Sequence, residues 1–396
     1  MLTTDARHGL RAHLPGLVSL ALASCLAVTT EMLPIGLLPA VSRDLGVTES
    51  ATGLTVSLYA TMVAALAVPL TLATARFPRK PLLLITVAGY ALSNTIVALA
   101  PEFVVFAAGR FLGGVTHALF FSLCIGYTPR LVGQAQVGRA LALVAGGASA
   151  GFVLGVPLST SLGTAAGWRF PFGLLAALAV VTFGLVTRLL PAVSNEPLPR
   201  PAAHGTGRRQ LVAVTAANAL TYLGQFTVYT FISVLLLAAG AAPALVGPIL
   251  LACGACGLIG LAYAGRTLDH DPRRATVLTL AIVIVAVTVL GFSFPVLAAV
   301  TAAAAVWNGA FGGVPSIFQA CALRTHAVAP ELAGAWVNAT ANLGIGGGAA
   351  IGAGVLELSG VSALPAVSAA LIAVALAVVL VSRRAFPSRA QPGGAG

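Results

Sequence analysis

Three ionisable residues, Glu31, Arg110 and His117, lie deep inside long apolar runs of this 396-residue chain. A charge at the centre of a bilayer costs about 2.5–3.5 kcal/mol, so such residues usually serve function. A rise of about 1.5 Å per residue along each run puts Glu31 and Arg110 within side-chain reach of each other. We expect Glu31 to bind a coupling proton and Arg110 to tune it, because desolvation favours a protonated carboxyl and a guanidinium favours an ionised one. A structural salt bridge between two helices is the alternative.

His117 follows Arg110 by two helical turns on nearly the same helix face. Its imidazole could relay protons or bond a substrate, because histidine changes charge near neutral pH. A packing role with one hydrogen bond explains the residue equally well. Glu357, by contrast, lies near the end of its apolar run, where an interfacial carboxylate needs no special function.

A polar stripe runs along the apolar segment 210–237. Its members recur at i, i+4, i+7 and i+11, which is the spacing of one helix face. Further amides and aromatic rings lie in 295–322 and 332–357, and one tyrosine lies in 52–74. We expect these side chains to line a site for a neutral or amphipathic molecule, with hydrogen bonding between helices as the alternative. The candidates for substrate binding are Tyr59, Asn218, Tyr222, Gln225, Tyr229, Trp307, Asn308, Asn338 and Asn342.

Membrane-spanning helices must position these residues. Hydrophobic residues make up 58% of the chain and charged residues only 8%, whereas soluble domains carry about 25% charged residues. A spanning helix needs about 20 mostly apolar residues, and unpaired backbone groups are not tolerated in lipid, so each run must be helical. Twelve runs qualify: 15–40, 52–74, 81–100, 102–127, 138–163, 169–190, 210–237, 244–265, 275–293, 295–322, 332–357 and 361–382.

The basic residues support this count and set an orientation. With the N-terminus in the cytoplasm, 18 of the 21 lysines and arginines fall in cytoplasmic segments, and only Arg43 and Arg169 fall in outside loops. The positive-inside rule requires this asymmetry. The net charge of +11 therefore reflects membrane orientation, and nucleic-acid binding is excluded because the basic residues form no continuous stripe. Both termini are expected in the cytoplasm.

The chain divides into two similar halves. The stretch 191–209, rich in proline and glycine, predicts a flexible cytoplasmic linker between a six-helix half at 1–190 and another at 210–396. Pro78 and Pro272 precede corresponding runs at an offset of 194. Glycines at a four-residue spacing recur at an offset of 197, and they are Gly147, Gly151 and Gly155 against Gly344, Gly348 and Gly352. Many secondary transporters are built from two such pseudo-symmetric halves.

Other classes of protein find little support. Cys253 and Cys256 have the spacing of a metal or redox pair, but no second pair or nearby histidine completes a set, so we expect neither a metal nor a cofactor. A membrane enzyme is disfavoured because no HExxH or GxSxG motif occurs and no run holds paired carboxylates. A sensor or assembly factor would need a larger soluble segment than the linker.

Short motifs add a family resemblance. Thr29-Thr30-Glu31 is followed by Gly36-Leu37-Leu38-Pro39, and Arg110-Phe111-Leu112-Gly113-Gly114 leads to His117. Gly151 and Gly155 precede Pro157, with Val156 between the glycine and the proline. Together these motifs resemble the major facilitator superfamily, and within it the bacterial drug and sugar efflux branch that includes arabinose, purine and chloramphenicol exporters. The last motif is similar to the glycine–proline motif of antiporters, from which the inserted valine departs.

The segment 71–80 is similar to a loop that helps to latch one conformation in this superfamily. Arg76, Arg79 and Lys80 match the family pattern, whereas Ala75 stands in place of its aspartate. The second copy, 265–274, keeps Asp269. The resemblance therefore implies roles in conformational gating for Arg76, Arg79, Lys80, Gly151, Gly155, Pro157 and Asp269.

The resemblance implies a secondary transporter rather than an enzyme. We expect it to export a small organic molecule, a drug or antibiotic, in exchange for protons by alternating access. A sugar or nucleoside exporter of the same fold is the alternative, and import is also open. The expected setting is the bacterial inner membrane, with the substrate, protons and membrane lipid as partners of a monomer.

Overall fold

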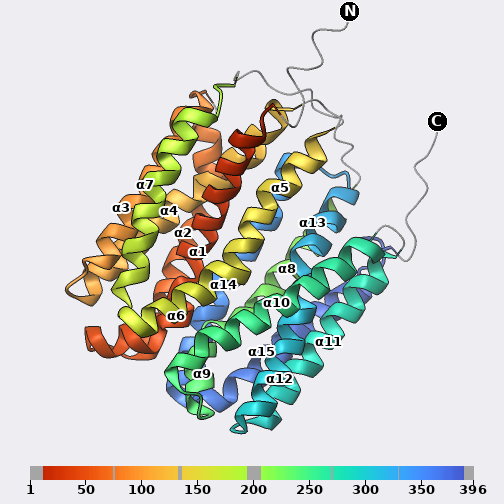
Figure 1. Ribbon diagram of the computed structural model, residues 1–396. Helices are drawn as coiled ribbons and strands as arrows, with labels where there is room; N and C mark the ends of the chain where they lie inside the picture. The colour runs from red at the N-terminus through yellow and green to blue at the C-terminus, as the bar shows by residue number, and fades with distance from the viewer. Residues whose placement is uncertain are drawn as a thin grey trace, which may run out of the picture. The chain divides into compact units, whose positions relative to one another are not determined.

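The computed structural model describes residues 12–74, 76–132, 136–193, 207–268, 271–328 and 330–387. Within these ranges the secondary structure is helical and no strand occurs (Figure 1). In the described part of the chain, twelve helical segments are long and apolar enough to cross a membrane, which confirms the predicted all-α membrane fold. These segments are Leu14–Leu45, Glu49–Ala73, Arg79–Ala98, Phe103–Cys124, Arg139–Ala166, Arg169–Leu189, Arg208–Ala238, Pro243–Thr267, Pro272–Ser293, Leu297–Arg324, Leu332–Ser359 and Val361–Val381.

Packing groups the chain into two units, Met1–Thr48 with Leu58–Leu198, and Glu49–Ser57 with Pro199–Gly396. The elements up to the linker are α1 (Leu14–Leu45), α2 (Glu49–Ala73), α3 (Arg79–Ala98), α4 (Phe103–Tyr127), α5 (Val137–Ala150), α6 (Val156–Ala166) and α7 (Arg169–Leu189). Those after it are α8 (Arg208–Tyr229), α9 (Ile232–Ala238), α10 (Pro243–Thr267), α11 (Pro272–Ser293), α12 (Leu297–Phe311), α13 (Val314–Arg324), α14 (Pro330–Ser359) and α15 (Leu364–Val381). The predicted linker falls largely at residues 194–206, outside the described residues.

The beginning of α2 belongs to unit 2. The Ser50 hydroxyl donates a hydrogen bond of 2.8 Å to the carbonyl oxygen of Ala353 in α14. A Cβ atom at Gly53 would lie only 2.4 Å from the Phe231 ring. Unit 2 therefore includes a segment that the sequence-based division at the linker assigns to the first half, because contacts rather than chain order define a unit.

Three predicted spans are interrupted helices. A π-helical turn, Gly151–Gly155, joins α5 to α6, and short breaks separate α8 from α9 and α12 from α13. The last break lies at Gly312-Gly313, where α12 approaches α10 closely. A Cβ atom at Gly312 would lie 1.9 Å from the carbonyl oxygen of Gly257. Glycine is required here because any side chain would push the two backbones apart.

The predicted glycine repeat packs in the same way in both units. In unit 1, α5 and the π-helical turn lie against α1, and in unit 2, α14 lies against α8 (Figure 1). A Cβ atom at Gly147 would lie 2.0 Å from the Ala21 carbonyl oxygen, and one at Gly344 would lie 2.5 Å from that of Ala219. The residues facing the six glycines are Ala21, Cys25 and Thr29 in α1, and Ala219, Leu223 and Thr227 in α8. Each α8 residue follows its α1 counterpart by 198 positions, so the repeat relates helix pairs as well as sequences.

Candidate functional site

Unit 1 contains a buried cluster of Glu31 from α1, Tyr59 from α2, and Arg110 and His117 from α4. None of the four exposes more than 6% of its surface. Glu31 and Arg110, which the residue spacing predicts to lie at similar depth, are neighbours in the structure. We call these four residues the carboxyl cluster.

Arg110 bonds the main chain of α1 rather than the Glu31 side chain. Its Nη1 donates to the Thr30 carbonyl oxygen at 2.6 Å, and its Nη2 donates to that of Glu31 at 2.7 Å. The reason lies four residues further along α1, where Pro34 has no N–H to donate to Thr30. A carbonyl without a partner is costly in a membrane interior, and the guanidinium satisfies it. The salt bridge considered as the alternative for Glu31 and Arg110 is thus replaced by hydrogen bonds to the helix backbone.

His117 connects Glu31 to Tyr59. Its Nε2 lies 3.6 Å from Glu31 Oε2, and its Nδ1 lies 3.0 Å from the Tyr59 hydroxyl oxygen. The other carboxyl oxygen, Glu31 Oε1, is buried and has no hydrogen-bond partner among the described residues. The imidazole thus lies between a carboxyl group and a phenol, and it can bond both at once only if each of its nitrogens takes a complementary role.

Aromatic rings and two glycines hold this arrangement. The His117 ring packs against Phe121 at a centroid distance of 5.0 Å and edge-on against Tyr59 at 5.5 Å. The Arg110 guanidinium lies 4.3 Å from the centroid of the Tyr59 ring. A Cβ atom at Gly113 would lie 2.7 Å from the Tyr59 ring, and one at Gly114 would lie 2.6 Å from the Tyr59 carbonyl oxygen. These glycines let α4 approach α2 closely enough for Tyr59 to reach both Arg110 and His117.

Unit 2 contains a neutral cluster of Gln225 and Tyr229 from α8 and Trp307 from α12. Trp307 Nε1 donates to Gln225 Oε1 at 2.6 Å, and the Trp307 and Tyr229 rings meet edge to face at 6.1 Å. Tyr222 continues the aromatic surface and meets Phe311 at 5.4 Å. The structure therefore brings together four of the residues predicted to bind substrate, and we call Tyr222, Gln225, Tyr229 and Trp307 the amide–aromatic cluster.

The remaining predicted amides bond within the helix bundle. Asn218 donates from α8 to the Val337 carbonyl oxygen of α14 at 2.8 Å, the bonding between helices that was the alternative interpretation of the polar stripe. Asn308 donates to the Ala304 carbonyl oxygen at 2.9 Å, and Asn342 donates to that of Asn338 at 3.0 Å, each within its own helix. These contacts give the three amides structural partners, so their assignment to a substrate site stays a prediction.

Comparisons with known proteins place this architecture in a family. A family model for the Major Facilitator Superfamily matches residues 20–331. The chain belongs to the major facilitator superfamily. It is 32% identical over 387 residues to a chloramphenicol efflux pump of Mycobacterium tuberculosis, an alignment that covers 93% of this chain and 92% of that protein. It is also 29% identical over 366 residues to a probable sugar efflux transporter of Mannheimia succiniciproducens, covering 91% of each.

Solved structures of this superfamily share the fold. A bacterial homologue of the human lysosomal transporter Spinster superimposes with a TM-score of 0.75 at 13% identity, over 96% of this chain and 98% of that one. A D-xylose–proton symporter gives a TM-score of 0.72 at 15% identity, over 95% and 98%. Family and relatives together identify a multi-pass membrane transporter rather than an enzyme.

The residues predicted to act in conformational gating lie at several separate places in the described part of the chain. Lys80 donates from α3 to the Thr187 carbonyl oxygen of α7 at 2.8 Å, Arg79 is half-buried, and Arg76 is exposed. Pro157 is the second residue of α6, which follows directly on the π-helical turn. Gly151 and Gly155 face α1. Ala75 and Asp269 lie outside the described residues, so the gating roles stay predictions.

Sequence reasoning missed two polar residues of α3 beside the carboxyl cluster. Asn94 donates to the Thr30 hydroxyl at 3.0 Å, and the Tyr90 ring meets the His117 ring edge-on at 6.1 Å. Both are fully buried. Their spacing of four residues in an apolar run puts them on one helix face, which is the same signal that revealed the stripe in α8.

Proposed function

We propose that this transporter exports a small organic molecule in exchange for protons, and that Glu31 carries the proton. The observation that supports the proposal is the buried contact between Glu31 and His117, with Tyr59 on the far side of the imidazole. An intramembrane carboxyl group is costly to keep and is usually functional. Here it has a titratable neighbour instead of a permanent salt-bridge partner.

The contact suits both protonation states of Glu31. When the carboxylate is ionised, the Tyr59 hydroxyl donates to Nδ1 and the Nε2–H of a neutral His117 points at Oε2. When Glu31 is protonated, its O–H points at a bare Nε2, and Nδ1–H donates to the Tyr59 oxygen. A phenol can donate or accept, so Tyr59 serves either tautomer. A change of tautomer at His117 therefore lets the imidazole face either form of the Glu31 carboxyl group while it keeps its hydrogen bond to Tyr59.

Arg110 provides a fixed positive charge beside this exchange. Because its hydrogen bonds go to the carbonyl oxygens of Thr30 and Glu31, they persist when the Glu31 side chain is neutral. The charge favours the ionised carboxylate and burial favours the protonated one. Opposed effects of this kind are what a carrier needs if it is to bind a proton on one side of the membrane and release it on the other.

The amide–aromatic cluster suits a neutral or amphipathic substrate. Aromatic rings supply apolar contact area, and Gln225 supplies the polar group that orients a ligand. A drug or antibiotic is the substrate class we infer, in keeping with the chloramphenicol relative. Sugar efflux is the second candidate and is supported by the Mannheimia relative. We further infer alternating access, a bacterial inner-membrane location with both termini in the cytoplasm, and a monomer.

Transport by inside-out vesicles tests the proposal. The vesicles are acidified inside, and lumenal pH is followed while drugs, sugars and nucleosides are added in turn to the wild type and to Glu31→Gln. We expect one substrate class to release protons from wild-type vesicles only. Substrate uptake with a flat pH trace, or coupling that survives in Glu31→Gln, would contradict the proposal.

A further inference from the structure

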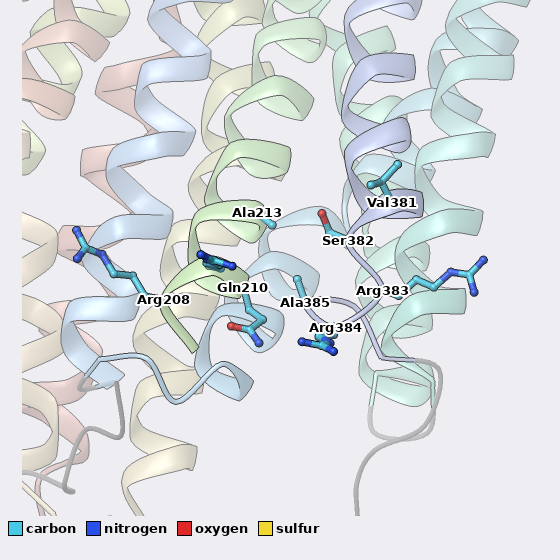
Figure 2. A pocket seen from close by; sticks show the side chains of 9 residues that line it. Arg208, Gln210, Ala213, Val381, Ser382, Arg383, Arg384 and Ala385 are labelled. Atoms are coloured by element: carbon cyan, nitrogen blue, oxygen red, sulfur yellow. The ribbon is translucent and has the colours of Figure 1, made fainter. Parts of the chain in front are cut away.

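A basic pocket of about 800 Å³ opens in unit 2 where α8 begins and α15 ends. Figure 2 shows Arg208 and Arg383 at its two sides, with Gln210 and Arg384 between them. The full lining is Arg208, Arg209, Gln210, Ala213, Val381, Ser382, Arg383, Arg384 and Ala385. It contains no residue of the amide–aromatic cluster, so the proposed transport function does not use it.

The pocket gathers four positive charges without a negative one. Each of the four arginines is exposed. The ion pairs formed among the described residues, His117 with Glu31 and Arg169 with Asp44, include none of them. Figure 2 shows the side chains of Arg208 and Arg383 extending outward at the two sides, with Arg384 between them, so the lining carries positive charge that a bound anion would offset. Arginine guanidinium groups bind phosphate oxygens in pairs, and the Gln210 amide and Ser382 hydroxyl can add further hydrogen bonds.

The pocket lies at the level in the membrane where lipid headgroups are expected. Arg208 begins one spanning segment and Val381 ends another, so the arginines lie where a helix leaves the apolar core. The positive-inside pattern assigns this end to the cytoplasmic side, whose leaflet carries anionic lipids. Val381, in the lining, exposes 84% of its surface and offers an apolar contact for an acyl chain beside the charged groups.

We infer that this pocket binds the phosphate group of an anionic phospholipid. The guanidinium groups of Arg209 and Arg384 bind the phosphate oxygens, and the acyl chains lie along the exposed end of α15. A soluble phosphate would satisfy the arginines but would leave the apolar side of the pocket uncovered. The lipid is a bound ligand of unit 2, separate from the transported substrate.

Native mass spectrometry of the full chain in detergent tests this inference. Phosphatidylglycerol, chain-matched phosphatidylethanolamine and inorganic phosphate are titrated separately. The test variant is Arg209→Gln/Arg384→Gln, and the charge-matched control is Arg139→Gln/Arg188→Gln, which removes two exposed arginines of unit 1 that the same rule assigns to the cytoplasm. Each basic residue near an anionic lipid contributes substantially to binding, so we expect the test variant to weaken phosphatidylglycerol binding roughly tenfold and the control to change it less than about twofold.

Three results would overturn the inference. Equal losses of phosphatidylglycerol affinity in the two double variants would indicate diffuse electrostatic attraction. Equal binding of phosphatidylglycerol and phosphatidylethanolamine would show that the pocket does not require a net negative headgroup. Displacement of the lipid by phosphate at equal concentration would indicate that the ligand is a soluble anion. If the test variant does not fold, Arg384→Gln alone is compared with Arg188→Gln. The same ordering of effects is expected at smaller amplitude, and no difference between these two variants would contradict the inference.

Discussion

The two units carry different side chains at equivalent positions of α1 and α8. The packing register that relates α1 to α8 places Tyr229 at the position of Glu31, 198 residues later. In unit 1 this position carries a carboxyl group beside His117. In unit 2 it carries a phenol that packs against the Phe226 and Trp307 rings.

The difference separates two tasks that transport must combine. A glutamate carboxyl group, with an ordinary pKa of about 4.3, releases its proton far more readily than a phenol, with an ordinary pKa of about 10. The helix packing is therefore common to both units, while the carboxyl group at this position occurs only in unit 1. We infer that unit 1 couples transport to protons and that unit 2 contributes aromatic and amide surface for the substrate.

The largest effect is expected when the ionisable group is removed from each of the two equivalent residues, Glu31 and Tyr229. Glu31→Gln should reduce substrate-dependent proton release to the level of empty vesicles, because the amide cannot exchange a proton. Tyr229→Phe should leave the number of protons released per substrate unchanged. Simultaneous measurement of substrate uptake and lumenal pH gives both numbers. A changed number of protons per substrate in Tyr229→Phe would contradict the assignment of proton coupling to unit 1 alone.

A large loss of stability is expected when Arg110 no longer bonds α1. Arg110→Met should lower the free energy of unfolding by about 1–3 kcal/mol, because the Thr30 carbonyl oxygen loses its donor. Pro34→Ala supplies an N–H to that oxygen, so the double variant should lose less than the sum of the single variants. Thermal unfolding in detergent measures the cycle. Strict additivity would show that the proline and the arginine are not linked.

The common packing of the two units predicts similar losses at equivalent glycines. Gly147→Ala in unit 1 and Gly344→Ala in unit 2 place a Cβ atom 2.0 and 2.5 Å from a carbonyl oxygen, and each should cost about 1–3 kcal/mol by overpacking. Gly146→Ala and Gly354→Ala are matched controls, since an added Cβ atom there meets nothing within 4 Å. Thermal unfolding should separate the pairs in both units, and a loss in only one unit would contradict a shared packing mode.

A smaller effect is expected from the phenol of the carboxyl cluster. Tyr59→Phe keeps the ring under Arg110 but removes the hydroxyl that bonds His117 Nδ1. One hydrogen bond contributes about 1 kcal/mol, so proton-coupled transport should fall about fivefold, with a displaced pH profile. A reduced rate with an unchanged pH profile would assign Tyr59 a packing role, or the substrate-binding role that its sequence position suggested.

The smallest effect is expected in the amide–aromatic cluster. Trp307→Phe removes the indole N–H that donates to Gln225 while keeping an aromatic ring. Substrate KM should rise about threefold, because this change corresponds to slightly less than the free energy of one hydrogen bond. The number of protons released per substrate should stay constant. Transport rates over a range of substrate concentrations measure KM. An altered proton ratio with constant KM would reverse the roles assigned to the two clusters.

Much of the architecture was predictable from local pattern. Apolar length, charge asymmetry and motif spacing indicated twelve spans and the superfamily, because lipid imposes these constraints on every span separately. The same patterns placed Glu31 and Arg110 at similar depth. They could not reveal that Arg110 bonds the backbone, since that depends on where the carbonyl left free by Pro34 meets α4. The helix breaks after α8 and α12 could not be predicted either, because they lie inside continuous apolar runs.

By itself, the sequence determined the number of spans, the repeated halves and the presence of a few costly ionisable groups in the membrane. Only the tertiary structure decided their partners, so that His117 bonds Tyr59 and lies beside Glu31, and Asn218 bonds α14. The physical reason is that depth and helix face follow from residue spacing. Which two faces meet, and at what rotation, is decided by close contacts such as those of Gly113 and Gly114 with Tyr59.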